Sequence, residues 1–140
     1  MPIRPENRAR YPKDWKTVRA RILERAGHKC ESCGVVDGAV GGRTGDGTWV
    51  YAQPGCGAAN AGTYPKPGAV GFCGPPGSGL VLPLVRIVLT IAHLDHTPEN
   101  CEPSNLRAWC QRCHNRYDAK MRAAGIKARR RARYAIGDLV

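Results

Sequence analysis

The chain has 140 residues and a formal net charge of +11, from 22 basic and 11 acidic residues. A chain of this length builds one small domain, and 17 glycines and 11 prolines leave little material for its core. A basic protein of this size commonly binds a polyanion, most often nucleic acid. The apolar run 80–92 is interrupted by Pro83 and Arg86 and is too short to cross a bilayer, so we expect no membrane partner.

Seven cysteines offer the stability that a small core lacks. Their odd number, and a start without the apolar segment of a secretory signal, argue against a disulfide framework. Two Cys-x-x-Cys pairs lie far apart in the sequence, Cys30/Cys33 and Cys110/Cys113, whereas Cys101 falls outside them and is interpreted as a small core residue. Two such pairs are typical of a structural Zn²⁺ site in a reducing compartment. We therefore expect structural zinc and a cytoplasmic location.

The first predicted elements lead directly to the first cysteine pair. Residues 1–12 are interpreted as an irregular basic arm. Residues 14–26 predict a helix, because their apolar side chains recur at helical spacing. Gly27 follows as a left-handed C-cap. The step from this helix to Cys30 is short, so the helix is expected to pack on the zinc site.

Residues 35–79 differ in composition from the rest of the chain, since they hold most of its glycines and several of its prolines. Such a segment buries too little apolar surface to form a domain of its own. We interpret it as an insertion, a β-hairpin with flexible loops, in which residues 48–51 form a strand. Cys56 and Cys73 lie within it, and they are either ligands of a further metal or two incidental thiols.

The second half of the chain predicts a strand, a turn and a helix in that order. Residues 86–92 are rich in β-branched side chains and deliver His93 at their end. Residues 97–104 are turn-rich, and residues 105–123 predict a turn, the second cysteine pair and a helix. The tail 125–140 is strongly basic, which fits either contact with DNA or a solvated terminal helix.

The order of strand, His93, turn, Asn105 and a helix carrying His114 resembles the HNH endonuclease family, whose active site is a ββα-metal fold. Two blocks carry this resemblance, roughly residues 15–34 and 87–117. The first contains the run Arg-Ala-Gly-His-Lys-Cys-Glu-Ser-Cys-Gly, which looks like the helix and knuckle of zinc-containing members. The second, with its His-Leu-Asp-His run, is similar to small phage and prophage nucleases.

The resemblance implies an α+β fold. We expect a small zinc-stabilised ββα-metal (His-Me finger) core with an N-terminal helix, a Gly/Pro-rich insertion and a basic C-terminal helix. Residues 1–140 would then form a single HNH nuclease domain. Its parts are the helix and first zinc knuckle (12–34), the insertion (35–79), the ββα-metal motif (80–124) and the basic tail (125–140).

The resemblance also implies the chemistry, which is metal-dependent hydrolysis of DNA phosphodiester bonds. His93 matches the general base, a role that suits imidazole because its pKa lies near neutral. Asn105 matches the residue that holds the loop and orients the base, and His114 matches a ligand of the catalytic metal. Asp118, four residues after His114, shares its helix face and is either a second ligand or a solvated carboxylate. The ion could be Mg²⁺, Mn²⁺, Ni²⁺ or Zn²⁺.

One position departs from the family pattern. The residue before the base is usually an Asp or His that binds the metal, and here it is Ala92. Either Asp95 or His96 supplies the missing ligand from the following turn, or these two residues are the catalytic pair and His93 is auxiliary. The spacing to Asn105 favours His93 as the base.

Partners and competing functions follow from the charge. Five arginines are candidate phosphate contacts, with surface solvation as the alternative: Arg112, Arg116, Arg129, Arg130 and Arg131. DNA is the expected partner, a phage terminase or another DNA-processing protein is a candidate second partner, and the setting is a bacterial or phage-infected host cell. The alternatives are a zinc-stabilised DNA-binding module without cleavage, which Ala92 favours, and a phage packaging accessory nuclease that is active only with a partner.

Overall fold

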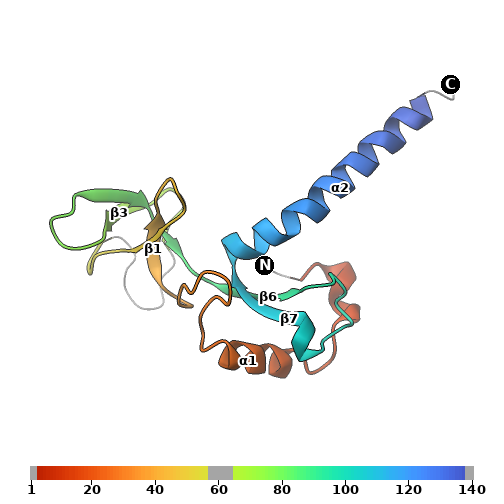
Figure 1. The fold of residues 1–140 in the computed structure, drawn as a ribbon, viewed down its shortest axis with the longest axis horizontal. Helices are drawn as coiled ribbons and strands as arrows, with labels where there is room; N and C mark the ends of the chain where they lie inside the picture. The colour runs from red at the N-terminus through yellow and green to blue at the C-terminus, as the bar shows by residue number, and fades with distance from the viewer. Residues whose placement is uncertain (1–2, 57–64, 138–140) are drawn as a thin grey trace.

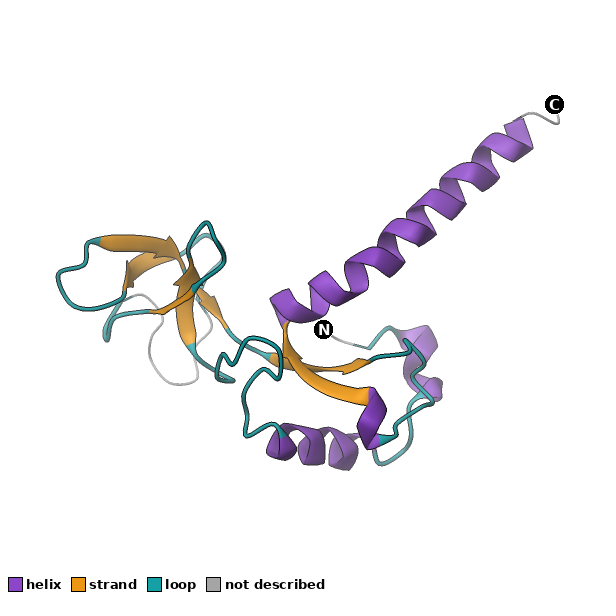
Figure 2. Cartoon of the chain, in the orientation of Figure 1, coloured by secondary structure: helices purple, strands orange, loops and turns teal. Residues whose placement is uncertain are grey.

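The computed structural model describes residues 3–56 and 65–137, which form a mixed α+β fold (Figures 1 and 2). In chain order the elements are η1 (Pro5–Arg10), α1 (Trp15–Arg25), β1 (Val40–Arg43), β2 (Trp49–Tyr51), β3 (Val70–Cys73), β4 (Leu80–Pro83), β5 (Val85–Arg86), β6 (Leu89–His93), η2 (Pro103–Asn105), β7 (Leu106–Cys110) and α2 (Gln111–Gly137). Within the described ranges, none of the helices combines the length and the apolarity needed to cross a membrane.

Helix α1 confirms the first predicted helix, and it ends where the sequence indicated. Gly27 has a φ of +62°, a left-handed conformation that glycine adopts without strain. The amide of Gly27 donates to the carbonyl of Glu24, and the amide of His28 donates to that of Leu23, both at 2.9 Å. These hydrogen bonds terminate α1, and the chain leads from there directly to the first cysteine pair.

Residues 5–10 form the short 3₁₀-helix η1, where the sequence suggested an irregular arm. The Arg10 guanidinium makes two hydrogen bonds to the Glu99 carboxylate, at 2.6 and 3.0 Å. Next to it, the Tyr11 ring packs edge-on against Trp15 and His93, with centroids 4.9 and 5.7 Å apart. These contacts hold the basic arm against the loop that follows β6.

The antiparallel pair β6–β7 is the centre of the fold, with α1 on one face and α2 on the other (Figure 1). Leu89 lies opposite Cys110, and the pairing continues in register until His93 lies opposite Leu106. Leu89, Leu106 and Cys110 lie on one face, are fully buried and belong to the core into which α1 packs. Because side chains alternate along a strand, Thr90 lies on the other face, towards α2.

Arg25, at the end of α1, fastens this helix to the β6–β7 unit. Its guanidinium donates to the carbonyls of Pro103 and Leu106, each at 2.7 Å, and to the Glu31 carboxylate at 3.1 Å. Glu31 in turn accepts a hydrogen bond of 2.6 Å from the amide of Ala108 in β7. This arginine therefore has a structural role in the described fold.

The insertion forms two small sheets beside the core, with strand orders β2-β1-β5 and β3-β4 (Figure 1). The strand expected at residues 48–51 is present as β2. The strand expected at residues 86–92 is divided, because β5 pairs with β1 of the insertion and β6 begins only at Leu89. The sheets of the insertion therefore extend to Arg86.

Helix α2 begins immediately after β7 and continues without a break through Gly125 to Gly137. Side chains 119–135 are all exposed, and this half of the helix projects away from the rest of the molecule (Figure 1). The basic tail is therefore helical over the residues that the structure describes.

Gly41 provides a test of the insertion sheet. A Cβ at this position would overlap the carbonyl oxygen of Val50 and would lie 2.9 Å from the Trp49 ring. We expect Gly41→Ala to separate β1 from β2 and to lower the free energy of unfolding by about 1–3 kcal/mol in urea denaturation. Gly45→Ala is the matched control, because a Cβ there meets nothing within 4 Å. Equal stability of the two variants would contradict this account.

Candidate functional site

The two cysteine pairs meet where α1 ends and α2 begins. The sulfur atoms of Cys30, Cys33, Cys110 and Cys113 all lie within 4.8 Å of one another. A tetrahedral zinc ion with Zn–S bonds of about 2.3 Å places its sulfurs roughly 3.8 Å apart. The Cys33 and Cys110 sulfurs are separated by 3.7 Å, close to that spacing. The cluster could therefore bind a metal ion such as zinc, as the sequence predicted.

Local backbone geometry brings each sulfur to this point. The amide of Cys30 donates to Val35 at 2.8 Å, and Gly34 turns the chain with a φ of +76°. The amide of Cys110 donates to the Cys30 sulfur at 3.3 Å, which joins the two pairs across the sheet. Cys113 follows in the first turn of α2. The cluster thus connects the turn after α1 to the junction of β7 and α2, 80 residues further along the chain.

The thiols of the cluster differ in acidity. Burial raises the pKa of Cys110 and raises that of Cys113 to about 12. Burial by itself would raise the pKa of Cys33 too. Hydrogen bonds from the backbone at Val35 and from the side chains of Cys113 and Arg43 outweigh this effect and lower the pKa of Cys33 to about 7. Thiolates are the form that binds metal, and of these three thiols only Cys33 has its pKa lowered by its surroundings.

Arg43, on β1, was not identified from the sequence. Its Nη2 atom lies 3.9 Å from the Cys33 sulfur and 3.7 Å from the Cys110 sulfur, while Nη1 donates to Gly47 at 2.9 Å. The guanidinium also lies over the Trp49 ring, 5.4 Å from its centroid. Four thiolates around a divalent ion carry excess negative charge, which this cation would offset while it attaches the insertion to the cluster.

The cluster predicts the metal content of the protein. We expect purified protein to carry about one zinc ion per chain by plasma mass spectrometry, held by the four cysteines. Cys113→Ser removes one ligand and should lose most of this zinc and lower the melting temperature. Cys101→Ser, outside the cluster, is the control and should retain the metal. Full zinc content in Cys113→Ser would contradict the assignment.

Arg43 predicts a difference in zinc affinity. Arg43→Ala removes the cation that contacts two of the sulfurs, and the loss of such an outer contact weakens metal binding by about 10–100-fold. Competition against a chromogenic chelator measures this change. Arg112→Ala is the matched control, because Arg112 lines the same hollow as Arg43 without a hydrogen bond to the cluster among those described. Identical zinc affinities in the two variants would argue against the role.

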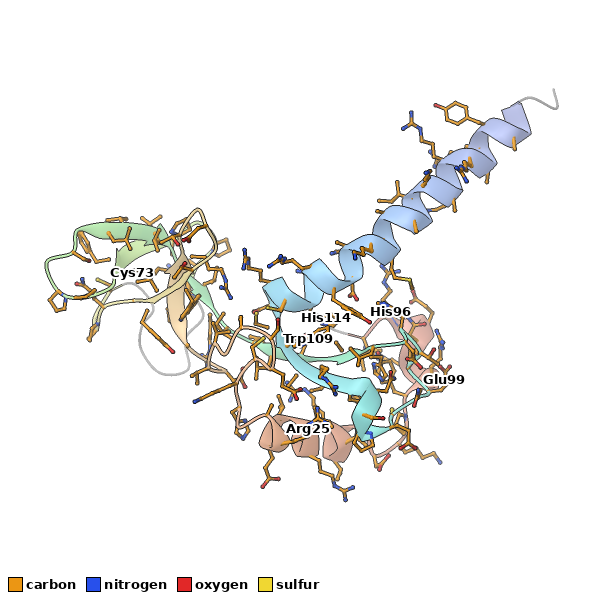
Figure 3. All side chains as sticks on the ribbon, in the orientation of Figure 1. Arg25, Cys73, His96, Glu99, Trp109 and His114 are labelled. Carbon is orange, nitrogen blue, oxygen red and sulfur yellow. The ribbon has the colours of Figure 1, made fainter. Side chains whose placement is uncertain are left out.

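A second group of candidate residues meets at the start of α2, where Figure 3 shows His96 and His114. Asp118 lies between the two imidazoles, with one carboxylate oxygen 3.5 Å from Nδ1 of His96 and the other 3.3 Å from Nε2 of His114. The hydroxyl of Thr90 lies 2.7 Å from Nδ1 of His114. Imidazole and carboxylate groups are donor types that bind divalent metals. Among the described residues, however, only the four-cysteine cluster groups three or more ligand atoms closely enough to hold an ion.

The turn after β6 directs His96 to this group. His96 has a φ of +57°, and its amide donates to the carbonyl of His93 at 3.1 Å. Its ring stacks on Tyr117 with centroids 5.3 Å apart, and the Tyr117 hydroxyl donates to Leu94 at 2.5 Å. Of the two residues considered as replacements for a ligand at Ala92, His96 is therefore the one that the structure brings to α2.

Asp95 has different partners, all within its own loop. Its carboxylate accepts hydrogen bonds from the Asn100 amide at 2.8 Å, the Asn105 amide at 2.9 Å and the Thr97 backbone at 2.9 Å. These hydrogen bonds lower the pKa of Asp95 to about 2. Asn105 thus holds the loop, and the described contacts do not join Asp95 to His114.

His93, at the end of β6, lies on the face that packs on α1. It is 8% exposed, stacks on Trp15 with centroids 5.4 Å apart, and has Nε2 at 3.8 Å from the Cys101 sulfur. Burial lowers the pKa of His93, which favours the neutral imidazole at neutral pH. His93 and His114 therefore approach β6 from opposite faces.

A cleft of about 410 Å³ opens beside His114 and Asp118, between η1, α1, β6 and α2. Its walls include Arg4 and Asn7 from the arm and Arg19 from α1. Arg4 and Asn7 were not identified from the sequence, because the arm gave no periodic pattern that could predict where it packs. The cleft places cationic and amide groups next to the second donor group.

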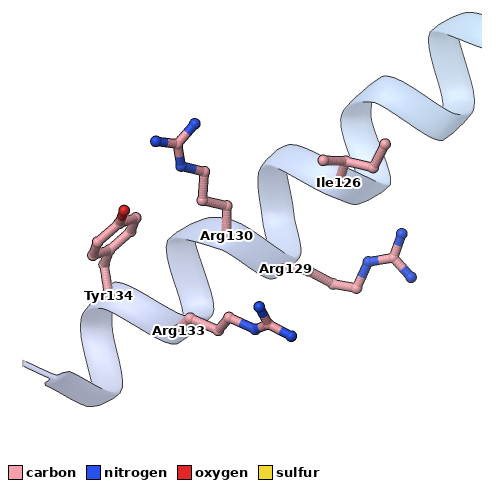
Figure 4. A pocket seen from close by; sticks show the side chains of 5 residues that line it. All are labelled: Ile126, Arg129, Arg130, Arg133 and Tyr134. Carbon is pink, nitrogen blue, oxygen red and sulfur yellow. The ribbon is translucent and has the colours of Figure 1, made fainter.

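The five arginines proposed for nucleic-acid contact all lie on α2 and are exposed. Arg112 and Arg116 occupy its first turns, beside the rest of the molecule. Arg129, Arg130 and Arg131 lie in the projecting half. Figure 4 shows Arg129 and Arg130 there, together with Arg133, Ile126 and Tyr134, which line a pocket. The Arg130 guanidinium lies 5.8 Å from the centroid of the Tyr134 ring.

The remaining thiols lie outside the four-cysteine cluster. Cys73 is fully buried in β3, and Cys56 is half-buried in the same insertion. Cys101 is half-buried beside His93, which agrees with its interpretation as a small core residue. Burial raises the pKa of both Cys73 and Cys101, so these thiols stay protonated at neutral pH.

Comparison of the chain with protein-family models, with curated proteins and with solved structures gave no match. Two features carry the most chemical information, namely the cluster of four cysteines and the group formed by His96, His114 and Asp118.

Proposed function

We propose that the protein is a metal-dependent endonuclease that hydrolyses DNA phosphodiester bonds. One observation carries the proposal: Asp118 lies between His96 and His114 at a cleft whose walls bear Arg4 and Arg19. Imidazole and carboxylate groups bind divalent cations such as Mg²⁺, Mn²⁺, Ni²⁺ or Zn²⁺. The arginines give the same cleft the charge that attracts a phosphodiester.

The order of elements supports an HNH-type ββα-metal core. Strands β6 and β7 are adjacent and antiparallel, and α2 follows directly. His93 ends the first strand, Asn105 holds the loop between the strands, and His114 lies in the first turns of the helix. These are the relative positions that the resemblance implies for the base, the loop residue and the metal ligand.

The proposed chemistry divides the work among these residues. When bound, a divalent cation neutralises the charge that develops on the phosphate oxygens. Asp118, His96 and His114 would hold it. The Thr90 hydroxyl donates to the carbonyl of Trp109 at 3.2 Å, so Nδ1–H of His114 donates to Thr90, which leaves Nε2 unprotonated and facing Asp118. On the assignment that the resemblance implies, His93 would accept the proton of the water that attacks phosphorus, and burial lowers its pKa, which favours the neutral imidazole that a base requires. The resemblance implies 5′-phosphate and 3′-hydroxyl products.

His96 is the second candidate for the base, and one observation favours it. His93 lies beneath Tyr11 and Trp15 on the α1 face of the sheet, whereas His96 lies beside Asp118 on the α2 face. On this assignment His93 is a buried packing residue, and the ligands of the ion are His114 and Asp118.

DNA as the substrate follows from the charge on α2. Residues 119–137 extend about 27 Å as a helix, at about 1.5 Å per residue. Arg129, Arg130 and Arg131 are exposed there, and Arg112 and Arg116 continue the basic surface to the start of the helix. We propose that these arginines contact backbone phosphates, which would make binding strongly dependent on salt.

A supercoiled-plasmid assay tests the function. Purified protein is incubated with Mg²⁺, Mn²⁺, Ni²⁺, Zn²⁺ or EDTA, and we expect nicked product only with metal. His93→Ala removes the general base and should lower the rate by about 10²–10⁴-fold, and Asp118→Ala should lower it because a ligand is lost. His28→Ala is the matched control, since His28 is an exposed histidine on the turn after α1.

The same assay separates the alternatives. Activity that survives His93→Ala and is lost in His96→Ala would transfer the role of base to His96. Intact plasmid with every metal, together with a salt-sensitive gel shift, would contradict the nuclease and favour the zinc-stabilised DNA-binding module.

A further inference from the structure

We propose that the N-terminal arm and α1 supply a phosphate-binding wall, in which the guanidinium groups of Arg4 and Arg19 and the amide of Asn7 bind a backbone phosphate of the DNA strand in the cleft. The inference rests on the proposed function, because it specifies how the same site holds its substrate. It assigns a binding role to a segment that the sequence presented only as a basic arm.

The position of these side chains is the first argument. Arg4, Asn7 and Arg19 line the cleft that His114 and Asp118 also line. Among the described residues that line it, Asp118 is the only carboxylate, and it already lies within 3.5 Å of two imidazoles. The other charged side chains that line the cleft, Arg4 and Arg19, are positive. The ligand that fits beside Asp118 and His114 is therefore an anion.

The arm is held in place before any ligand binds, which is the second argument. Arg10 makes two hydrogen bonds to Glu99 across the loop that follows β6, and the Tyr11 ring packs on Trp15. A preorganised segment loses little conformational freedom when it binds, so its contacts contribute more to affinity than those of a flexible tail.

Both guanidinium groups also have the capacity to bind a phosphate. Arg19 uses its Nη2 atom to donate to the Leu89 carbonyl at 3.2 Å, which orients a group that carries five N–H donors. Arg4 lies 4.0 Å from Glu6, and both side chains are more than 60% exposed, so this ion pair is weak and exchangeable. Guanidinium groups bind phosphate oxygens in pairs, and such contacts are independent of base sequence.

The experiment compares cleft residues with neighbours on the same elements. Arg4→Ala and Arg19→Ala are tested in the full chain against Arg8→Ala on η1 and Arg21→Ala on α1, which are exposed and do not line the cleft. Binding of a short fluorescent DNA duplex is measured without added divalent metal and without chelator, so that the four-cysteine cluster keeps its metal, over a series of salt concentrations, and plasmid cleavage is measured with metal. Melting temperatures verify that each variant is folded.

We expect each cleft variant to bind DNA about tenfold more weakly than its control, with a salt slope smaller by about 0.9 for each lost phosphate contact. Arg19→Lys should restore part of the affinity, because the charge returns without the paired donors. If the cleft variants bind DNA as tightly as their controls while the wild type cleaves DNA, the phosphate-binding role of Arg4 and Arg19 is wrong and the proposed nuclease activity stands. Weakened binding confined to the cleft variants, with no cleavage under any metal, would support the wall and reject the nuclease.

Discussion

The cluster of four cysteine sulfurs is the constraint on which the rest of the structure depends. It joins the turn after α1 to the end of β7 and the first turn of α2, and so connects segments about 80 residues apart. Cys30 and Cys110 are themselves buried residues of the small core. Because His114 directly follows Cys113, the cluster also fixes where α2 begins, and with it the position of Asp118 one helical turn later.

Features governed by short-range rules could be predicted from the sequence. The apolar spacing that predicted α1, the left-handed glycine that ends it and the helical face shared by His114 and Asp118 all depend on residues a few positions apart. The four-cysteine cluster was predictable across a long separation for a different reason. Thiol pairs at this spacing have few chemical uses other than metal binding in a reducing compartment. The mixed α+β class followed from the same patterns.

Features governed by strand register and long-range contacts could not be predicted. The face of the sheet on which His93 lies depends on its pairing with Leu106, and a shift of one residue would reverse it. The left-handed backbone of His96, which turns its ring towards α2, has no signal in the sequence comparable to a glycine. The place of the arm depends on Arg10 and Glu99, which are 89 residues apart in the chain.

The charge distribution connects the fold to the proposed partner. Residues 35–86 contain three basic and two acidic residues, so nearly all of the +11 charge lies on the core and on α2. The projecting half of α2 has exposed side chains throughout and gains no packing, and isolated helices of this length are marginal in water. A polyanion that binds the arginines only when they are arrayed on a helix stabilises that helix by mass action. Ordering of this half of α2 and binding of nucleic acid would then be a single coupled equilibrium.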